Sequence, residues 1–153
     1  MEILFPFHPR TVHFPIALTL VGVFSIVLST VLTRRAGNGG GDATRWMQYG
    51  RTTLGLGWAA TLVAIMTGLV DQSRARDDVA VVSTINLHIT TGIALVVALG
   101  LALYWPLRDR QVFTRHRWAY VGLMLLIAAL VLVESWLGGK LVYQLGVGIR
   151  ATP

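Results

Sequence analysis

The sequence predicts an all-α integral membrane protein that forms one bundle of four membrane-spanning helices. Of its 153 residues, 54% are hydrophobic and 13% are charged, about half the charged fraction of an ordinary soluble domain. So few charged side chains cannot cover a water-exposed surface of normal polarity. This composition excludes a water-soluble enzyme and a disordered tail. The absence of cysteine also excludes disulfides, thiolate metal sites and cysteine nucleophiles.

The four spans follow from the lengths of the apolar stretches. About 20 apolar residues in a helix cross a bilayer core, and lipid cannot satisfy backbone groups outside a helix. The predicted spans cover about residues 12–33, 52–70, 85–105 and 118–137 of a single domain, 1–153, with a short apolar tail at 138–153. The first stretch is longer than the ~7–15 residues of a signal peptide, so we expect it to be retained. Short linkers make successive helices antiparallel.

The positive charges predict the orientation. Eight arginines lie in the loops between spans one and two and between spans three and four, and five Lys or Arg residues lie on the opposite side. Because basic loops stay on the cytoplasmic side, we expect a multi-pass protein with both termini outside, which is the periplasm if the membrane is the inner membrane of a Gram-negative bacterium. The same clustering favours a lipid bilayer over nucleic acid as the partner of a chain with net charge +6. The eight arginines are Arg34, Arg35, Arg45, Arg51, Arg108, Arg110, Arg115 and Arg117.

Ionisable residues gather near the outer face. At about 1.5 Å per residue, four of them lie roughly 24–28 Å from the inner ends of their helices, in a core ~30 Å thick. Such groups inside a membrane are functional candidates by default. The four are His13, Asp71, His88 and Glu134, with His8 just beyond them and His116 at the inner face.

Two of these histidines suit haem. If helices one and three run parallel across the core, His13 and His88 face each other as the axial imidazoles of a haem iron. Small residues would leave room for the flat ring, although such stripes also serve ordinary packing of membrane helices. Around the ligands, His8, Asp71 and Glu134 are expected to orient or tune the site. The predicted wall residues are Gly57, Ala60, Ala64, Gly68 and Gly92.

Other uses of these polar residues stay open. A zinc or copper ion could take mixed ligands from His8, His13, His88 and a carboxylate, but their spacing does not define such a site. Proton handling through Glu134 lacks a polar path to the inner face. The cluster could also be a structural hydrogen-bond network that holds the helix ends together.

The opening motif resembles a known family. His8-Pro9-Arg10-Thr11-Val12-His13-Phe14-Pro15 matches the H-P-x-x-V-H-F-P opening of a bacterial membrane family catalogued as domain of unknown function 2231. Weaker matches are Gly68-Leu69-Val70-Asp71, His88 with Gly92, and Gly138-Gly139-Lys140-Leu141-Val142-Tyr143. The resemblance covers almost the whole chain and implies a four-helix membrane module. A further likeness to four-helix b-type cytochromes suggests haem at His13 and His88.

Two functional hypotheses follow. The first is an electron-transfer module that binds one b-haem near the outer face and exchanges electrons with a redox partner. The second is a non-catalytic accessory subunit that packs against other membrane subunits of a larger redox, photosynthetic or respiratory complex. Under both hypotheses the chain is an electron carrier or an accessory protein rather than an enzyme.

Overall fold

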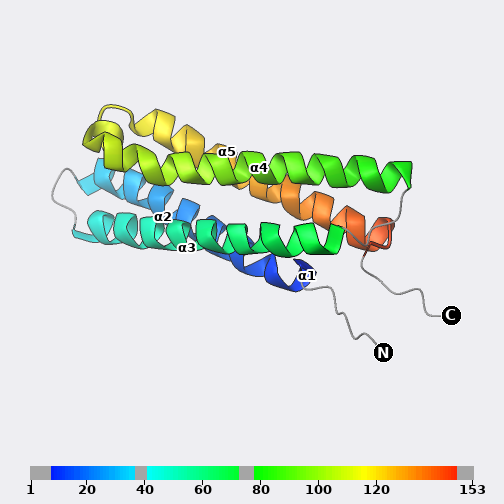
Figure 1. Cartoon of the computed structure of the whole chain (residues 1–153). Helices are drawn as coiled ribbons and strands as arrows, with labels where there is room; N and C mark the ends of the chain where they lie inside the picture. Colours follow the sequence, from blue (N-terminus) through cyan, green and yellow to red (C-terminus); the bar gives the residue numbers. More distant parts are fainter. Residues whose placement is uncertain (1–7, 37–40, 73–77, 148–153) are drawn as a thin grey trace.

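The computed structural model describes residues 8–36, 41–72 and 78–147, and these residues form an antiparallel bundle of four long helices (Figure 1). Four helical stretches are long and apolar enough to cross a membrane: His8–Arg34, Gly41–Val70, Val79–Arg108 and Arg117–Gln144. The predicted all-α, four-span architecture is therefore confirmed. The elements are α1 His8–Thr11, α2 His13–Ala36, α3 Gly41–Gln72, α4 Val79–Arg108, η2 Arg110–Phe113, α5 Arg117–Gly139 and η3 Lys140–Gln144, a π-helical continuation of α5.

Each helix extends beyond its predicted span. Helix α3 begins at Gly41, well before residue 52, and Asp42 in its first turn suits the positive end of the helix dipole. Helix α4 begins at Val79, where the side chain of Asp78 accepts a hydrogen bond from the Ala80 amide at 2.8 Å. The predicted tail is helical as far as Gln144. Hydrophobicity locates the part of a helix that lies in lipid, whereas caps decide where the helix ends.

A break separates α1 from α2 at Val12. Pro15 lacks the N–H that would bond to the carbonyl of Thr11, and its ring crowds that carbonyl. The neighbouring bonds persist, from the Val12 amide to the His8 carbonyl at 3.2 Å and from the Ile16 amide to the Val12 carbonyl at 3.3 Å. The chain therefore turns slightly between His8 and the long helix without leaving the helical path.

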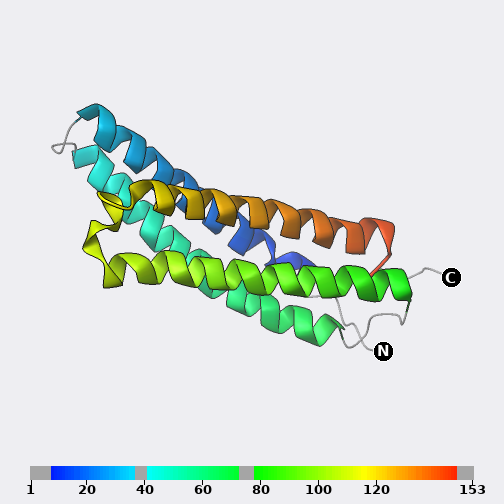
Figure 2. The ribbon, with the colours of Figure 1, turned by 90° about the horizontal axis from the view of Figure 1, so that it is seen from above.

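Helices α2 and α3 approach each other closely because glycines line their contact. A Cβ on Gly22 would lie 2.9 Å from the backbone nitrogen of Leu54, and one on Gly57 would lie 2.8 Å from Oγ1 of Thr19. Figure 2, which shows the bundle from above, shows α2 and α3 crossing α4 and α5 at an angle. Fully buried side chains from all four long helices form one core, including Ile26, Leu54, Leu99, Met124 and Ile127.

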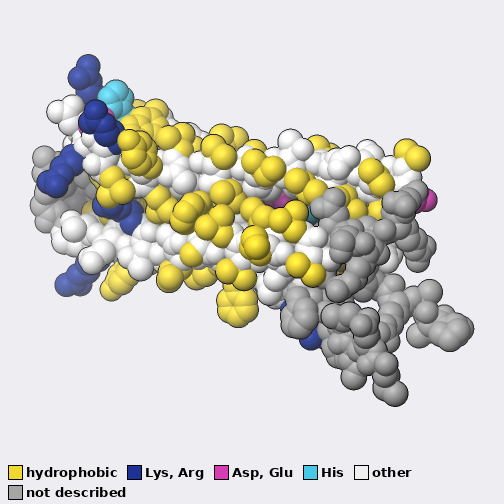
Figure 3. Space-filling model, in the orientation of Figure 1, with side chains coloured by type: hydrophobic (Ala, Val, Ile, Leu, Met, Phe, Trp, Pro, Cys, Tyr) yellow, Lys and Arg dark blue, Asp and Glu magenta, His cyan; other side chains and the backbone are white. Residues whose placement is uncertain are grey.

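The outside of the bundle is apolar along its length, and the two ends of the bundle differ in their charged and polar side chains. Large hydrophobic side chains are exposed along every long helix, for example Phe24, Met66, Val97 and Leu132, and they form the yellow surface in Figure 3. Such a surface suits lipid contact. We call the end with the basic side chains (dark blue in Figure 3) the arginine end; its arginines include Arg34, Arg45, Arg108, Arg110 and Arg115. The half of the bundle containing His8, His88 and Glu134 is the histidine half.

Candidate functional site

A polar cluster joins four helices in the histidine half. His8 comes from α1, His88 from α4 and Glu134 from α5, while α3 contributes Ala64 and Thr67. The side chains of His88 and Glu134 are only 21% and 13% exposed. We call His8, His88 and Glu134, with the threonines Thr11, Thr67 and Thr91 that contact them, the histidine cluster. It lies among apolar helices, so its polar groups depend on one another for partners.

The ring of His8 is held against α3 through one nitrogen. Its Nδ1 lies 2.8 Å from the carbonyl oxygen of Ala64 and 3.3 Å from Oγ1 of Thr67. A carbonyl only accepts, so Nδ1 carries the proton in this contact. The Thr11 hydroxyl donates to the His8 carbonyl at 3.0 Å and lies 3.2 Å from Oγ1 of Thr67. In the neutral ring the lone pair is therefore on Nε2.

His88 is paired with Glu134. Its buried Nδ1 lies 2.7 Å from Oε2 of Glu134, an ion-pair distance, although the direction of the contact does not meet hydrogen-bond geometry. The other carboxylate oxygen accepts from the hydroxyl of Thr91, one turn along α4 from His88. A carboxylate at Nδ1 favours the tautomer with the proton on Nδ1, which leaves the lone pair of the ring on Nε2.

The two histidine rings meet. Their centroids are 6.1 Å apart and their planes are inclined at 74°. The chain thus brings together two imidazoles whose Nδ1 atoms each face an oxygen acceptor, the Ala64 carbonyl for His8 and the Glu134 carboxylate for His88. In each ring the nitrogen that does not contact this acceptor is Nε2.

The histidine that meets His88 is not the one that the sequence suggested. His13, at the start of α2, is exposed, and the ring in contact with His88 is that of His8. Residues five apart in a helix point about 140° away from each other, so only one of these two histidines can face the bundle. His8, expected only to surround the ligands, is the ring that contacts His88, and Glu134 lies beside His88.

Of the small residues that the sequence predicted as the haem wall, one packs against another helix and the others lie beside the histidine cluster or are partly buried. Gly57 is occupied by packing against Thr19 of α2, so it forms no wall around the histidines. Gly68 lies against the His8 ring, where a Cβ would be 3.1 Å from Cε1, and a Cβ on Gly92 would be 3.7 Å from Oε2 of Glu134. Ala64 contributes its backbone carbonyl. Ala60 is partly buried.

The remaining candidates lie elsewhere. Asp71 is in the last turn of α3, and its side chain lies outside the described residues. His116 is at the arginine end, with Nε2 3.9 Å from Oδ2 of Asp109, which agrees with an interfacial role. In the described ranges no three or more His, Asp or Glu side chains are grouped so that they could hold a metal ion.

Sequence reasoning missed three contributors to the site. Thr67 and Thr91 contact His8 and Glu134 through hydroxyls that the sequence did not distinguish from those of other membrane threonines. Gly138, where a Cβ would lie 3.9 Å from Cε1 of His88, stood in a weak motif. Their spacing could have indicated them, because residues three or four apart lie on the same face of a helix. Thr67 and Gly68 lie one turn after Ala64, and Thr91 and Gly92 lie one turn after His88.

Replacing Gly68 with alanine is expected to displace the His8 ring, because the added methyl group would stand 3.1–3.5 Å from three of its atoms. Gly122 is the matched control, since a Cβ there meets nothing within 4 Å. The measurement is the NMR chemical shift of ring-labelled histidines in detergent micelles. We expect the His8 and His88 signals to move in the Gly68 variant only. Unmoved signals in both variants would contradict the contact.

Comparison with known proteins gives a family and nothing finer. A family model described as a predicted membrane protein, DUF2231, matches residues 4–151. No curated protein and no solved structure matches the chain.

Proposed function

The chain belongs to the DUF2231 family of predicted membrane proteins, and from that premise we propose that the histidine cluster holds one b-type haem in a membrane-embedded electron-transfer module. The observation that carries the proposal is the pair of adjoining imidazoles, one with Nδ1 2.8 Å from the Ala64 carbonyl oxygen and the other with Nδ1 2.7 Å from Oε2 of Glu134. Histidines that bind metals usually direct their second nitrogen to a carbonyl or a carboxylate in this way. His8 and His88 replace the pair His13 and His88 as the proposed axial ligands.

The donor set suits haem better than a bare metal ion. Haem iron needs only axial ligands from the protein, whereas structural and catalytic zinc sites take three or four protein ligands. His8 and His88, whose ring centroids are 6.1 Å apart, would be the two residues that hold the haem iron.

The surrounding residues have roles that fit this proposal. A bound haem would supply one-electron transfer. The Glu134 carboxylate, which lies at Nδ1 of His88, would orient that imidazole. Gly68, Gly92 and Gly138 keep bulky side chains away from His8, Glu134 and His88 respectively. The Ala64 carbonyl orients the His8 ring.

The proposal also places the site in the cell. Because the arginine end is the more basic end, it faces the cytoplasm under the positive-inside rule. The histidine half then lies toward the outer face of a bacterial inner membrane, with both termini outside. A redox partner or another membrane subunit on that side would exchange the electrons.

The test is an optical spectrum of protein purified after expression with ample haem. We expect a Soret band and sharp reduced α and β bands from the wild type, and loss of these bands in His88→Ala. His116→Ala is the matched control, since His116 lies at the arginine end, and it should keep the spectrum. A colourless wild type, or a His88→Ala protein with an unchanged band, would overturn the proposal.

The same contacts also support a second candidate function, because they join pairs of helices. The hydrogen bonds of His8 tie α1 to α3, and the Glu134 contacts tie α5 to α4. Such a network could simply fix helix ends in an accessory subunit of a larger membrane complex. In that case the purified protein is colourless and His88→Ala lowers the thermal unfolding temperature. A haem protein instead loses its spectrum in the same variant.

A further inference from the structure

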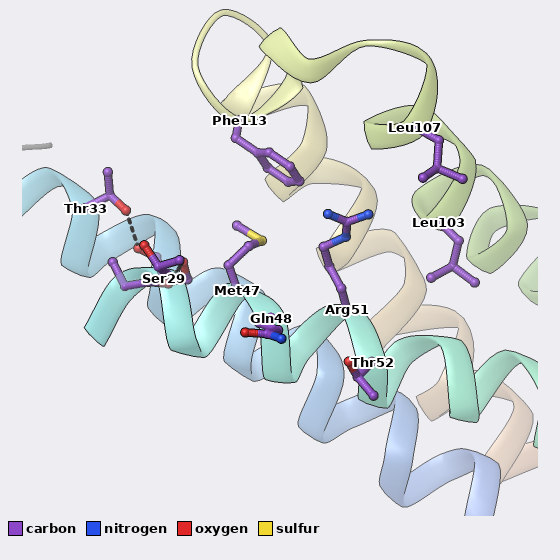
Figure 4. A pocket seen from close by; sticks show the side chains of 11 residues that line it. Ser29, Thr33, Met47, Gln48, Arg51, Thr52, Leu103, Leu107 and Phe113 are labelled. Carbon is purple, nitrogen blue, oxygen red and sulfur yellow. Dashed lines mark hydrogen bonds between the residues drawn. The ribbon is translucent and has the colours of Figure 1, made fainter. Parts of the chain in front are cut away.

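The arginine end contains a cavity of about 740 Å³ between α2, α3, α4 and η2 (Figure 4). Its polar lining comes mostly from one face of α3, at Thr44, Gln48, Arg51 and Thr52. Its apolar lining includes Met47, Leu103, Leu107 and Phe113. Leu107 is 72% exposed, so the cavity is open on the side where a membrane would supply lipid.

Arg51 is the charged group in this cavity. It is the eleventh residue of α3, about 15 Å along the helix from Gly41. Its side chain is partly buried, and Figure 4 shows it directed from α3 toward the side where Phe113 and Leu103 lie. Within residues 8–36, 41–72 and 78–147, no hydrogen bond or ion pair reaches its guanidinium.

Nearby acidic side chains are engaged elsewhere. Asp42 lies 4.0 Å from Arg45. Asp109 accepts from the Gln111 amide at 2.8 Å and lies 3.9 Å from His116. No carboxylate lines the cavity. Arginines inside a membrane are usually paired, and Arg51 is therefore available to a partner from outside the described chain.

We propose that this cavity binds the phosphate headgroup of an anionic phospholipid through Arg51. The guanidinium presents a fork of N–H donors that matches two phosphate oxygens, and Thr44, Gln48 and Thr52 also line the cavity. One acyl chain lies along Leu103, Leu107 and Phe113. Basic pockets between membrane helices on the cytoplasmic side suit such headgroups.

The size of the cavity favours a lipid over a free phosphate ion. A phosphate ion fills only a few times the ~30 Å³ that a water molecule occupies, a small part of 740 Å³. The apolar half of the lining would then face water. A phospholipid satisfies both halves, with its headgroup on Arg51 and its chain on the leucines.

The experiment measures lipid bound to the purified full chain by native mass spectrometry in a neutral detergent. Phosphatidylglycerol, phosphatidylcholine and inorganic phosphate are added separately. We expect phosphatidylglycerol to bind, and Arg51→Gln to bind it at least about tenfold more weakly, as the loss of a charge-assisted hydrogen bond implies. Arg45→Gln removes an exposed arginine at the same end and should bind like the wild type.

Three results would overturn the proposal. Equal weakening in Arg51→Gln and Arg45→Gln would indicate a diffuse charge effect. Equal binding of phosphatidylcholine would remove the role of net negative charge. Inorganic phosphate that displaces phosphatidylglycerol completely at millimolar concentration would identify a free oxyanion as the ligand.

Two additional variants guard against misfolding. Arg51→Lys keeps the charge and loses the fork, so it should retain binding between those of wild type and Arg51→Gln. Leu103→Trp narrows the apolar wall without changing charge and should also weaken phosphatidylglycerol binding. Gel filtration and helical circular dichroism verify that each variant is folded, and full binding by both folded variants would contradict the proposed pose.

Discussion

Replacing Gly22 with valine is expected to disrupt the contact between α2 and α3 and to lower the free energy of unfolding by about 1–3 kcal/mol or more. A Cβ on Gly22 would already stand 2.9 Å from the backbone nitrogen and 3.1 Å from the Cα of Leu54. Backbone atoms cannot rotate away as a flexible side chain can, so the helices must separate. Fully buried neighbours such as Ile26 and Leu54 would then lose packing.

The measurement is thermal unfolding in detergent, followed by circular dichroism. Gly122→Val is the control, because Gly122 is exposed on α5 and a Cβ there meets nothing within 4 Å. Both variants change the intrinsic helix propensity equally, and the comparison therefore isolates the helix contact. Equal unfolding temperatures for the two variants would show that α2 and α3 are not in contact at Gly22.

The second large effect distinguishes the two histidines of the opening motif. If the histidine cluster holds haem as proposed, we expect His8→Ala to lose it almost completely, with affinity reduced by more than about tenfold, because one of the two proposed ligands is removed. His13→Ala should retain haem, since His13 is exposed and it is His8 that contacts His88. The measurement is the Soret absorbance per mole of purified protein.

The two variants control for each other, because they change the same residue type within the same motif. Retained haem in His8→Ala with loss in His13→Ala would restore the sequence-based pair and contradict the geometry of the histidine cluster. Loss in both variants would indicate that the motif as a whole, rather than one ring, is needed. Unfolding temperatures measured in parallel separate loss of haem from loss of fold.

Most of the fold could be predicted from the sequence. Four apolar stretches of sufficient length in a chain with 13% charged residues leave only a helical membrane bundle, because lipid cannot satisfy an open backbone. Helix ends were predicted less well. The start of α3 at Gly41 and the start of α4 at Val79 depend on caps and interfacial turns, and these features contribute little to hydrophobicity.

The sequence predicted which residues belong to the candidate site, but it did not predict which histidine contacts His88. Depth along each helix placed His88 and Glu134 at similar levels, and they are in contact at 2.7 Å. Depth alone could not choose between His8 and His13, because the choice depends on how α1 is rotated about its axis. Pro15 interrupts the hydrogen bonding at that point, and the break affects the rotation.

For Arg51, too, the sequence predicted less than the structure shows. Counted in a loop, it was one of eight positive charges that orient the chain. In the structure it is on α3 and lines a cavity with Leu103 and Phe113, a position that no count of charges reveals.

The amino-acid sequence by itself determined that this protein is a four-helix membrane bundle with a basic end and a histidine-containing half, because burial in lipid depends on composition and length. Only the tertiary structure decided that His8 contacts His88 and that Gly57 packs against α2. The physical reason is that side-chain pairing depends on the rotation and crossing of whole helices, which the packing of all four helices sets together.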